Sequence, residues 1–345
     1  MPTKNYLNLA REGTFATAPS TGWHGVAVED LGGHVANVPV LQPKTMKYGQ
    51  QGQSALGRRS LIRGAKGALK AYLETPSRPL LDLLEASFGE PTVTTLAAGE
   101  AYEHVFSTGG TLPLLTLAAQ VGREFKAGGQ DRDTFTGGQI EKVSMSQGMT
   151  PMSSGVTDEG LAKIQFGLDY AKMFPGVTST ERLPTYVDPD AVFSGGDWTF
   201  LIGADLDNLE AECVDGFGFE FMPGLNFDDA ACASTLTRDQ AGRGAMPSAK
   251  MTSSWTYKGR EYYDAWLNGT VLAARSAYEV ASLWLDGDET IHPSFTIDIA
   301  AFGLTGDGPK ESADSATKQD LASDVLWNED DDMVTVTVVC SDAGL

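Results

Sequence analysis

The sequence lacks the residue patterns that usually carry enzyme chemistry. It has four histidines in 345 residues, and no two of them have the spacing of metal ligands. It has no nucleophile elbow, P-loop or dinucleotide-binding fingerprint. With 46 acidic residues, some carboxylates must lie close together, so a glycosidase-like pair carries no information. We therefore predict no enzymatic activity, no cofactor, and no catalytic, cofactor-binding or metal-binding residues. We expect surface or turn positions for the histidines, His24, His34, His104 and His292.

The chain is also poor in cysteine and has no long apolar run. Its three cysteines, Cys213, Cys232 and Cys340, are odd in number and lack metal-like spacing. This favours reduced cytosolic thiols, with a Cys213–Cys232 disulfide as the alternative. No apolar stretch approaches the roughly 20 residues of a membrane-spanning helix. Residues 1–6 contain a lysine with no apolar core behind it, so we expect neither a secretory signal nor a membrane partner.

Positive charge is scarce in the second half of the chain. Residues 1–175 hold 16 Lys/Arg and 16 Asp/Glu, whereas residues 176–345 hold 9 and 30. The whole net charge of −21 therefore belongs to the second half. Such a surface repels nucleic acid, although a solvated face that keeps the protein soluble is an equally good reading.

What the sequence does contain is one unit that occurs twice. In each copy a Gly-Arg pair precedes a strand-like run that ends at a tyrosine, and a short helix that ends at a glycine follows. The equivalent positions are Gly57 and Gly242, Tyr72 and Tyr257, and Gly89 and Gly269, at spacings of 185, 185 and 180 residues. A repeat of this length indicates a duplicated domain rather than a solenoid.

Alternating apolar residues predict a mainly β fold. Residues 163–170, 217–222 and 294–301 alternate apolar with polar or small side chains, which is typical of half-buried strands. The 39 glycines exceed the usual ~7% and indicate many turns. The polar segments 122–138 and 304–327 are expected to be long hydrophilic hairpins or loops.

We predict two tandem β-sandwich or partial-barrel domains, each with one short flanking α-helix and long loops. The first comprises residues 1–175, with its first ten residues as an N-terminal arm, and the second comprises residues 176–345. The proline-containing stretch 174–190 is the expected connection.

Two short helices are predicted, one in each copy. Residues 78–88 place leucines and a phenylalanine at helical spacing, after Ser77 as a candidate N-cap and before Gly89 as a stop. Residues 261–267 form the second helix, and Trp266 on its apolar side is expected to pack in the core.

Acidic and basic clusters are interpreted as solvated surface. The acidic runs 205–208, 286–289 and 329–332 offer oxygen ligands for calcium, but none has the loop pattern of an EF-hand, so turns are predicted. The basic stretch is interpreted as one polar strand face that meets the acidic half of a neighbouring subunit. It comprises Arg58, Arg59, Arg63, Lys66 and Lys70.

Four blocks resemble the tail tube (major tail) proteins of long non-contractile-tailed bacteriophages, the siphophages. They are residues 64–73 (GAKGALKAYL), 78–89 (RPLLDLLEASFG), 101–106 (AYEHVF) and 262–270 (YYDAWLNGT). A strand that leads into a leucine-rich helix ending in Phe-Gly is typical of that family. The resemblance covers most of the chain by organisation but only these blocks by motif.

The resemblance implies a structural virion protein without enzymatic activity. Subunits are expected to self-associate into rings that stack into the tail tube, the conduit for double-stranded DNA during ejection. With a duplicated tube domain, a trimeric pseudo-hexamer is favoured over a hexamer. Implied partners are the tape-measure protein, the tail terminator, and baseplate or tip proteins, while DNA passes transiently without specific binding. The implied location is the virion tail, assembled in the host bacterial cytoplasm.

Two alternatives stay open. One is another virion structural role: tail terminator, minor tail protein or capsid decoration. The other is a carbohydrate-binding β-sandwich module, which predicts exposed aromatic residues that converge on one site. The candidates are Trp255, Trp266, Trp284 and Trp327.

Overall fold

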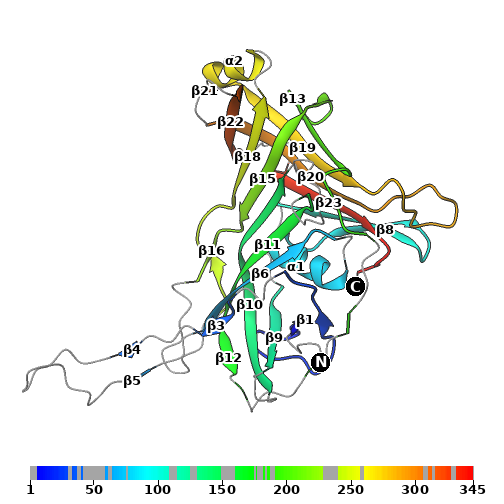
Figure 1. The fold of residues 1–345 in the computed structure, drawn as a ribbon. Coiled ribbons are helices and arrows are strands. Elements are labelled where there is room, and N and C mark those ends of the chain that lie inside the picture. Colours follow the sequence, from blue (N-terminus) through cyan, green and yellow to red (C-terminus); the bar gives the residue numbers. More distant parts are fainter. Residues whose placement is uncertain are drawn as a thin grey trace, which may run out of the picture.

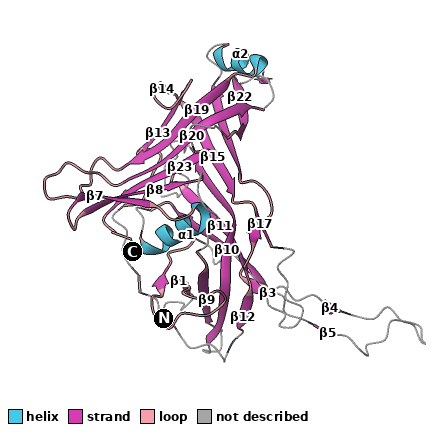
Figure 2. Cartoon of the chain, turned by 180° about the vertical axis from the view of Figure 1, so that it is seen from behind, coloured by secondary structure: helices cyan, strands magenta, loops and turns pink. Residues whose placement is uncertain are grey.

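The chain is a mainly β protein with one large network of antiparallel strands and two small two-stranded sheets (Figures 1 and 2). The computed structural model describes residues 6–29, 33–36, 40–41, 59–60, 64–74, 77–108, 115–124, 130–148, 160–174, 176, 182, 185–186, 191–227, 240–256, 260–305, 310–312, 315–327 and 332–344. In these ranges there are two α-helices, α1 (Arg78–Phe88) and α2 (Glu261–Asn268). The predicted mainly β class with short helices is confirmed.

The strands follow the chain in two series. Those of the first half are β1 (Tyr6–Arg11), β2 (His24–Gly25), β3 (Val35–Ala36), β4 (Val40–Leu41), β5 (Arg59–Ser60), β6 (Ala65–Tyr72), β7 (Thr92–Ala97), β8 (Ala101–Ser107), β9 (Leu117–Glu124), β10 (Gln130–Gly148), β11 (Lys163–Tyr170) and β12 (Lys172–Phe174). Those of the second half are β13 (Trp198–Gly203), β14 (Leu209–Ala211), β15 (Val214–Met222), β16 (Leu225–Asn226), β17 (Gly242–Arg243), β18 (Ser248–Thr256), β19 (Val271–Glu279), β20 (Ser294–Leu304), β21 (Lys310–Ser312), β22 (Ser315–Val325) and β23 (Val334–Cys340). The two small sheets are β4–β5 and β16–β17.

A closed barrel lies at the centre of the network. Strands β11, β10, β15, β18, β22, β20, β19 and β13 follow one another as antiparallel neighbours, and β6 pairs with β11. The lead-in to β13 closes the ring, because Ser194 pairs with Leu161 just before β11 and Val192 pairs with Glu74 just after β6. The barrel therefore contains strands from both halves of the chain.

Two branches leave the barrel. Strands β23, β8 and β7 extend in that order from β20. The first part of β10 pairs with β9 and β12, and β9 continues to β1 and β2. Strand β10 changes partners along its length and has irregular register near Gly137, whose φ of +67° favours glycine.

Strand pairs cross the predicted domain boundary at residues 175 and 176. Strand β10 of the first half pairs with β15 of the second, and β8 pairs with β23. The two halves therefore share one sheet network. The division into two tandem domains stays a prediction, and most of the expected connection 174–190 lies outside the described residues.

The strand–helix–strand order of the repeat recurs in the structure. Strand β6, α1 and β7 follow one another in the first half, and β18, α2 and β19 in the second. The two helices differ in burial: nine of the eleven residues of α1 are buried, whereas none of α2 is. The core position expected for Trp266 is therefore wrong. Its ring is half-buried and lies 5.6 Å from that of Tyr263.

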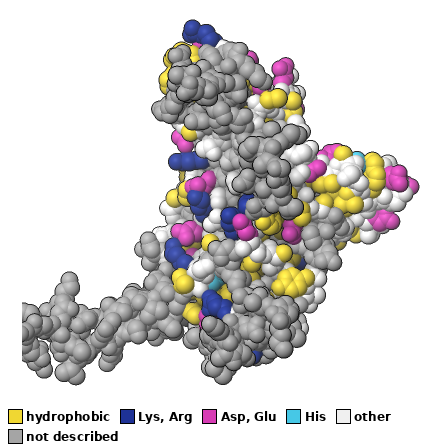
Figure 3. Space-filling view, viewed as in Figure 1, with side chains coloured by type: hydrophobic (Ala, Val, Ile, Leu, Met, Phe, Trp, Pro, Cys, Tyr) yellow, Lys and Arg dark blue, Asp and Glu magenta, His cyan; other side chains and the backbone are white. Residues whose placement is uncertain are grey.

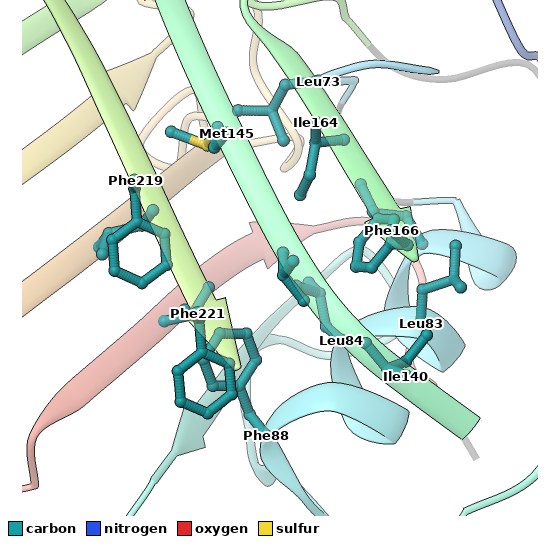
Figure 4. Close-up of a cluster of buried hydrophobic side chains, with 14 of the residues drawn as sticks. Leu73, Leu83, Leu84, Phe88, Ile140, Met145, Ile164, Phe166, Phe219 and Phe221 are labelled. Atoms are coloured by element: carbon teal, nitrogen blue, oxygen red, sulfur yellow. The ribbon is translucent and has the colours of Figure 1, made fainter. Parts of the chain in front are cut away.

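Helix α1 forms where its sequence predicts, and it packs on the barrel strands. Ser77 is its N-cap residue but makes no side-chain cap hydrogen bond, while the Gly89 N–H donates to the Glu85 carbonyl and φ at Gly89 is +107°. Leu83, Leu84 and Phe88 project towards buried side chains of β10, β11 and β15 (Figure 4). Burying a leucine or phenylalanine stabilises the fold by about 1.5–3 kcal/mol.

Residues 6–10 of the predicted N-terminal arm belong to a core strand. Residues 6–11 form β1, which pairs with both β9 and β2, and Leu7 and Leu9 are almost fully buried. An apolar segment with a strand partner on each side satisfies its main-chain groups and buries its side chains, which an arm extended in water cannot do. Residues 1–5 lie outside the described residues.

Candidate assembly surface

An unprotected edge strand projects from one side of the molecule. Strand β7 pairs with β8 and, among the described residues, has no strand on its other side. All side chains from Thr92 to Leu96 are exposed, with Val93 at 43% and Leu96 at 42%. The β7 sequence, Thr-Val-Thr-Thr-Leu-Ala, favours extended backbone and carries no charge. Its main-chain groups are therefore available for a further strand.

The hairpin of β7 and β8 rests against the loop between β19 and β20. The Gly287 N–H donates to Glu100 Oε2 at 3.0 Å, which joins the hairpin turn to this loop. We call residues 91–107 and 280–293 together the lateral lobe. Figure 3 shows hydrophobic and acidic side chains next to one another on this lobe, at the right of the view.

Hydrogen bonds give the loop of the lateral lobe a fixed shape. Asp286 Oδ1 accepts the N–H groups of Thr290 and Ile291 at 2.9 Å, and Oδ2 accepts the Thr290 hydroxyl at 2.6 Å. The pKa of Asp286 is lowered, mainly because its carboxylate accepts the hydrogen bond from the Thr290 hydroxyl. The Trp284 ring lies over His292, with centroids 3.8 Å apart. The acidic run 286–289 is thus a hydrogen-bonded turn, as predicted.

A small cavity lies beneath the hairpin, beside α1. It measures about 100 Å³, and its lining includes Arg11, Glu85, Glu90, Val93 and His104. Arg11 bridges Asp82 at 2.6 Å and Glu85 at 2.5 Å, while burial raises the pKa of Glu85. Small-molecule sites are usually ~300–1,000 Å³, so this cavity does not indicate a ligand site.

Three lysines on strands β6 and β10 form ion pairs within the chain. Lys66 lies 3.0 Å from Glu141, and Lys70 lies 3.0 Å from Glu29. Lys142 on β10 pairs with Glu220 on β15. The basic stretch predicted from sequence is therefore only partly described, and its two described lysines already have acidic partners. Arg58 and Arg63 lie outside the described residues, as does the side chain of Arg59.

The other acidic runs give no cation site in the described residues. Asp205 Oδ1 accepts the Asp207 N–H and the Asn208 side-chain amide, which forms a self-contained turn. The run 329–332 is described only at Asp332. In the part of the chain that the structure describes, no group of three His, Cys, Asp or Glu side chains is arranged to hold a metal.

The four histidines lie apart, and two of them are not where we predicted. His34 and His104 are buried at 2% and 1% exposure, so surface or turn positions are wrong for both. His34 Nε2 lies 3.1 Å from the Tyr170 hydroxyl, whose pKa is raised by burial. His104 Nε2 lies 2.8 Å from the Asp342 carbonyl. Both serve packing, which explains why no pattern in the local sequence indicates them.

Aromatic and cysteine residues form no common site in the described part of the chain. Trp266 belongs to α2 at one end of the molecule, while Trp284 lies in the lateral lobe (Figures 1 and 2). Trp327 follows β22 and is 69% exposed, and the Trp255 side chain is outside the described residues. Cys213 is exposed and Cys340 is buried. Cys213 is a free thiol in the structure, so the alternative of a Cys213–Cys232 disulfide is wrong, although Cys232 itself lies outside the described residues.

No motif in the sequence marks β7 as a functional element. Its signal is an uncharged run rich in threonine directly after Pro91, with neither lysine nor proline inside the strand. That signal predicts a strand but not an edge, because an edge is defined by the absence of a second neighbour.

Comparison with protein-family models and with curated proteins finds no match to this chain. No helix among the described residues is long and apolar enough to cross a membrane.

Proposed function

We propose that this chain is the structural subunit of a bacteriophage tail tube and has no enzymatic activity. The observation that carries the proposal is the recurrence of strand, helix and strand in β6–α1–β7 and β18–α2–β19, within one antiparallel network. This organisation is the one implied by the family resemblance of residues 64–89 and 262–270. A chain with two such units supplies two quasi-equivalent positions in a ring, so three chains make a pseudo-hexamer.

The filled interior of the barrel supports a channel that lies between subunits rather than one that runs through a single subunit. Side chains on the inner faces of the barrel strands are buried, among them Met145, Phe166, Phe219 and Ile297. A barrel of about eight strands is just wide enough for side chains to fill its interior. In the proposed tube, DNA and the tape-measure protein therefore occupy a channel enclosed by several chains.

Charge supports passage of DNA without specific binding. The net charge of −21 repels phosphate, and Lys66, Lys70 and Lys142 are ion-paired within the chain. Because DNA affinity comes largely from cations that contact phosphates, such a surface lets DNA slide. The proposal includes a tail terminator at one end of the tube, baseplate or tip proteins at the other, and assembly in the bacterial cytoplasm.

Labelling of virions tests this proposal. Antibodies raised against the recombinant chain, carrying gold, are incubated with phage particles from a host that carries this sequence. The proposal predicts regular gold labels along the whole tail. Labels confined to the capsid, or to one end of the tail, would replace it with a decoration or terminator role.

No specific observation favours another virion structural role or a carbohydrate-binding module. A carbohydrate-binding module needs exposed aromatic residues at one place, but Trp266 belongs to α2 and Trp284 to the loop between β19 and β20. We therefore propose no second function.

A further inference from the structure

Strand β7 lacks most of the features that normally protect a sheet edge. Such edges are usually short, charged, proline-containing or covered, because unpaired main-chain groups attract other strands. Strand β7 has six residues, no charge and no proline. Its register with β8 is regular from Thr92 to Thr95, and its one irregularity, between Thr95 and Ala97, lies next to the hairpin turn. We propose that β7 pairs with a strand edge of a second copy of this chain. This inference rests on the proposed function, and it names the contact between neighbouring subunits.

The lateral lobe holds β7 ready for pairing. Strand β8 is paired on both sides, with β7 and with β23, and the Glu100–Gly287 hydrogen bond fixes the hairpin turn. A strand that is already extended and fixed loses little conformational entropy when a partner binds. An added strand also covers part of the exposed Val93 and Leu96 side chains.

Charge disfavours the pairing of two β7 strands with each other. The lobe carries exposed carboxylates at Glu90, Glu100, Asp288 and Glu289. If two β7 strands paired with each other in antiparallel fashion, Glu90 of each copy would lie beside the acidic turn of the other. Like charges that face each other across strands are destabilising. Pairing of β7 with a different strand edge of the second copy avoids this repulsion.

The positions of the lobe and of other strand edges agree with such a head-to-tail contact. The lobe lies on one side of the molecule, and β3 and β12 lie on the other, in both Figure 1 and Figure 2. A contact between different surfaces on opposite sides generates a ring when it closes and a filament when it does not. A two-fold contact would produce only a dimer.

Matched lysine substitutions test the edge. Thr94→Lys places a charge on the exposed β7 edge. Thr252→Lys makes the same change at an exposed position of β18, whose main chain is already paired with β15 and β22. Sedimentation velocity of the full chain measures assembly over a concentration series, and circular dichroism checks the fold. We expect Thr94→Lys to raise the concentration needed for assembly at least about tenfold, and Thr252→Lys to leave it unchanged.

Hydrogen exchange of the unmodified chain is the second readout. It does not depend on the folding of any variant. Amides of residues 92–97 should exchange at least about tenfold more slowly in the assembled fraction than in the monomer. Unchanged exchange at β7 in an assembled sample overturns the inference. Normal assembly of a folded Thr94→Lys variant also overturns it, as does a loss of assembly in Thr252→Lys equal to that in Thr94→Lys.

The outcomes separate the inference from the proposed function. Tubes that form without β7 protection leave the tube proposal standing and overturn this contact. Open chains or rings that depend on β7 but never stack into tubes support the contact and overturn the tube. A dimer as the largest species overturns the head-to-tail arrangement, and a chain that stays monomeric contradicts both.

Discussion

Phe88 of helix α1 stacks on Phe221 of strand β15, with ring centroids 4.5 Å apart and planes 15° from parallel. Phe88 belongs to the first half of the chain and Phe221 to the second. Both rings are nearly fully buried, at 4% and 2% exposure. This contact, together with the β10–β15 pairing, makes the helix of one half part of the core of the other. The halves should therefore unfold together.

Phe88→Ala tests this coupling. Removal of the ring should lower the free energy of unfolding by about 3–5 kcal/mol, because the cavity left between α1 and β15 cannot collapse fully. Denaturant unfolding followed by fluorescence and by circular dichroism should show one shared transition at lower denaturant. Phe174→Ala, at a 42% exposed position, is the matched control and should change stability much less. Two separate transitions in Phe88→Ala would mean that the halves are independent units.

The two helices should respond differently to the same substitution. Leu83→Ala in α1 removes a side chain with 1% exposure and should cost about 2–5 kcal/mol. Leu267→Ala in α2 removes one with 55% exposure and should cost less than about 1 kcal/mol in the monomer. Thermal melts at low protein concentration compare the two. Equal losses would show that α2 is packed in the core.

Glu12 should make stability depend on pH. Its carboxylate accepts the Ala16 and Gly137 N–H groups and the Thr116 hydroxyl, and burial raises its pKa from the ordinary 4.5. The folded chain therefore holds this proton more tightly than the unfolded chain. The resulting stabilisation is fully present below about pH 4.5 and decreases as the pH rises through the raised value.

Glu12→Gln measures this contribution. The variant should lack the corresponding pH dependence. At neutral pH it should be less stable by about 1–3 kcal/mol, because the amide NH₂ turns towards a donor that the carboxylate had satisfied. Unfolding free energies from pH 4 to pH 8 give both effects. Parallel pH profiles for the two proteins would exclude Glu12 as the titrating group.

Arg11 should stabilise the contact between β1 and α1. It bridges Asp82, whose side chain is 3% exposed, and Glu85. Arg11→Met should destabilise the fold by about 2–4 kcal/mol, since a buried carboxylate loses a partner, although Arg78 still lies 3.1 Å from Asp82. A double-mutant cycle with Asp82→Asn should recover part of the loss. Strict additivity of the two changes would contradict a direct interaction.

The spacing of apolar residues predicted strands and helices well where one face of the element is buried along its whole length. The alternation in residues 163–170 corresponds to β11 (Lys163–Tyr170), and the leucine spacing in residues 78–88 corresponds to α1. The polar segment 122–138 is a hairpin of β9 and β10, as expected, although strand extends further into it than a loop would allow.

The predictions that were wrong concern residues whose burial depends on segments far away in the sequence. Whether residues 6–11 form an arm or a core strand depends on β9 as a partner, which lies more than 100 residues away. The burial of His34 depends on Tyr170, which lies 136 residues further along the chain. The exposure of α2, none of whose residues is buried, likewise depends on how distant segments pack around it. The closure of the barrel through Ser194 and Leu161 involves single residue pairs that no periodicity indicates.

The most direct test of the account is negative-stain electron microscopy of the purified recombinant chain, with the solution mass measured on the same sample. The account predicts hollow tubes or stacked rings and a ring mass of three chains of 36.7 kDa, with pseudo-sixfold symmetry in projection. Particles that stay monomeric at every concentration, with neither rings nor tubes, would contradict it.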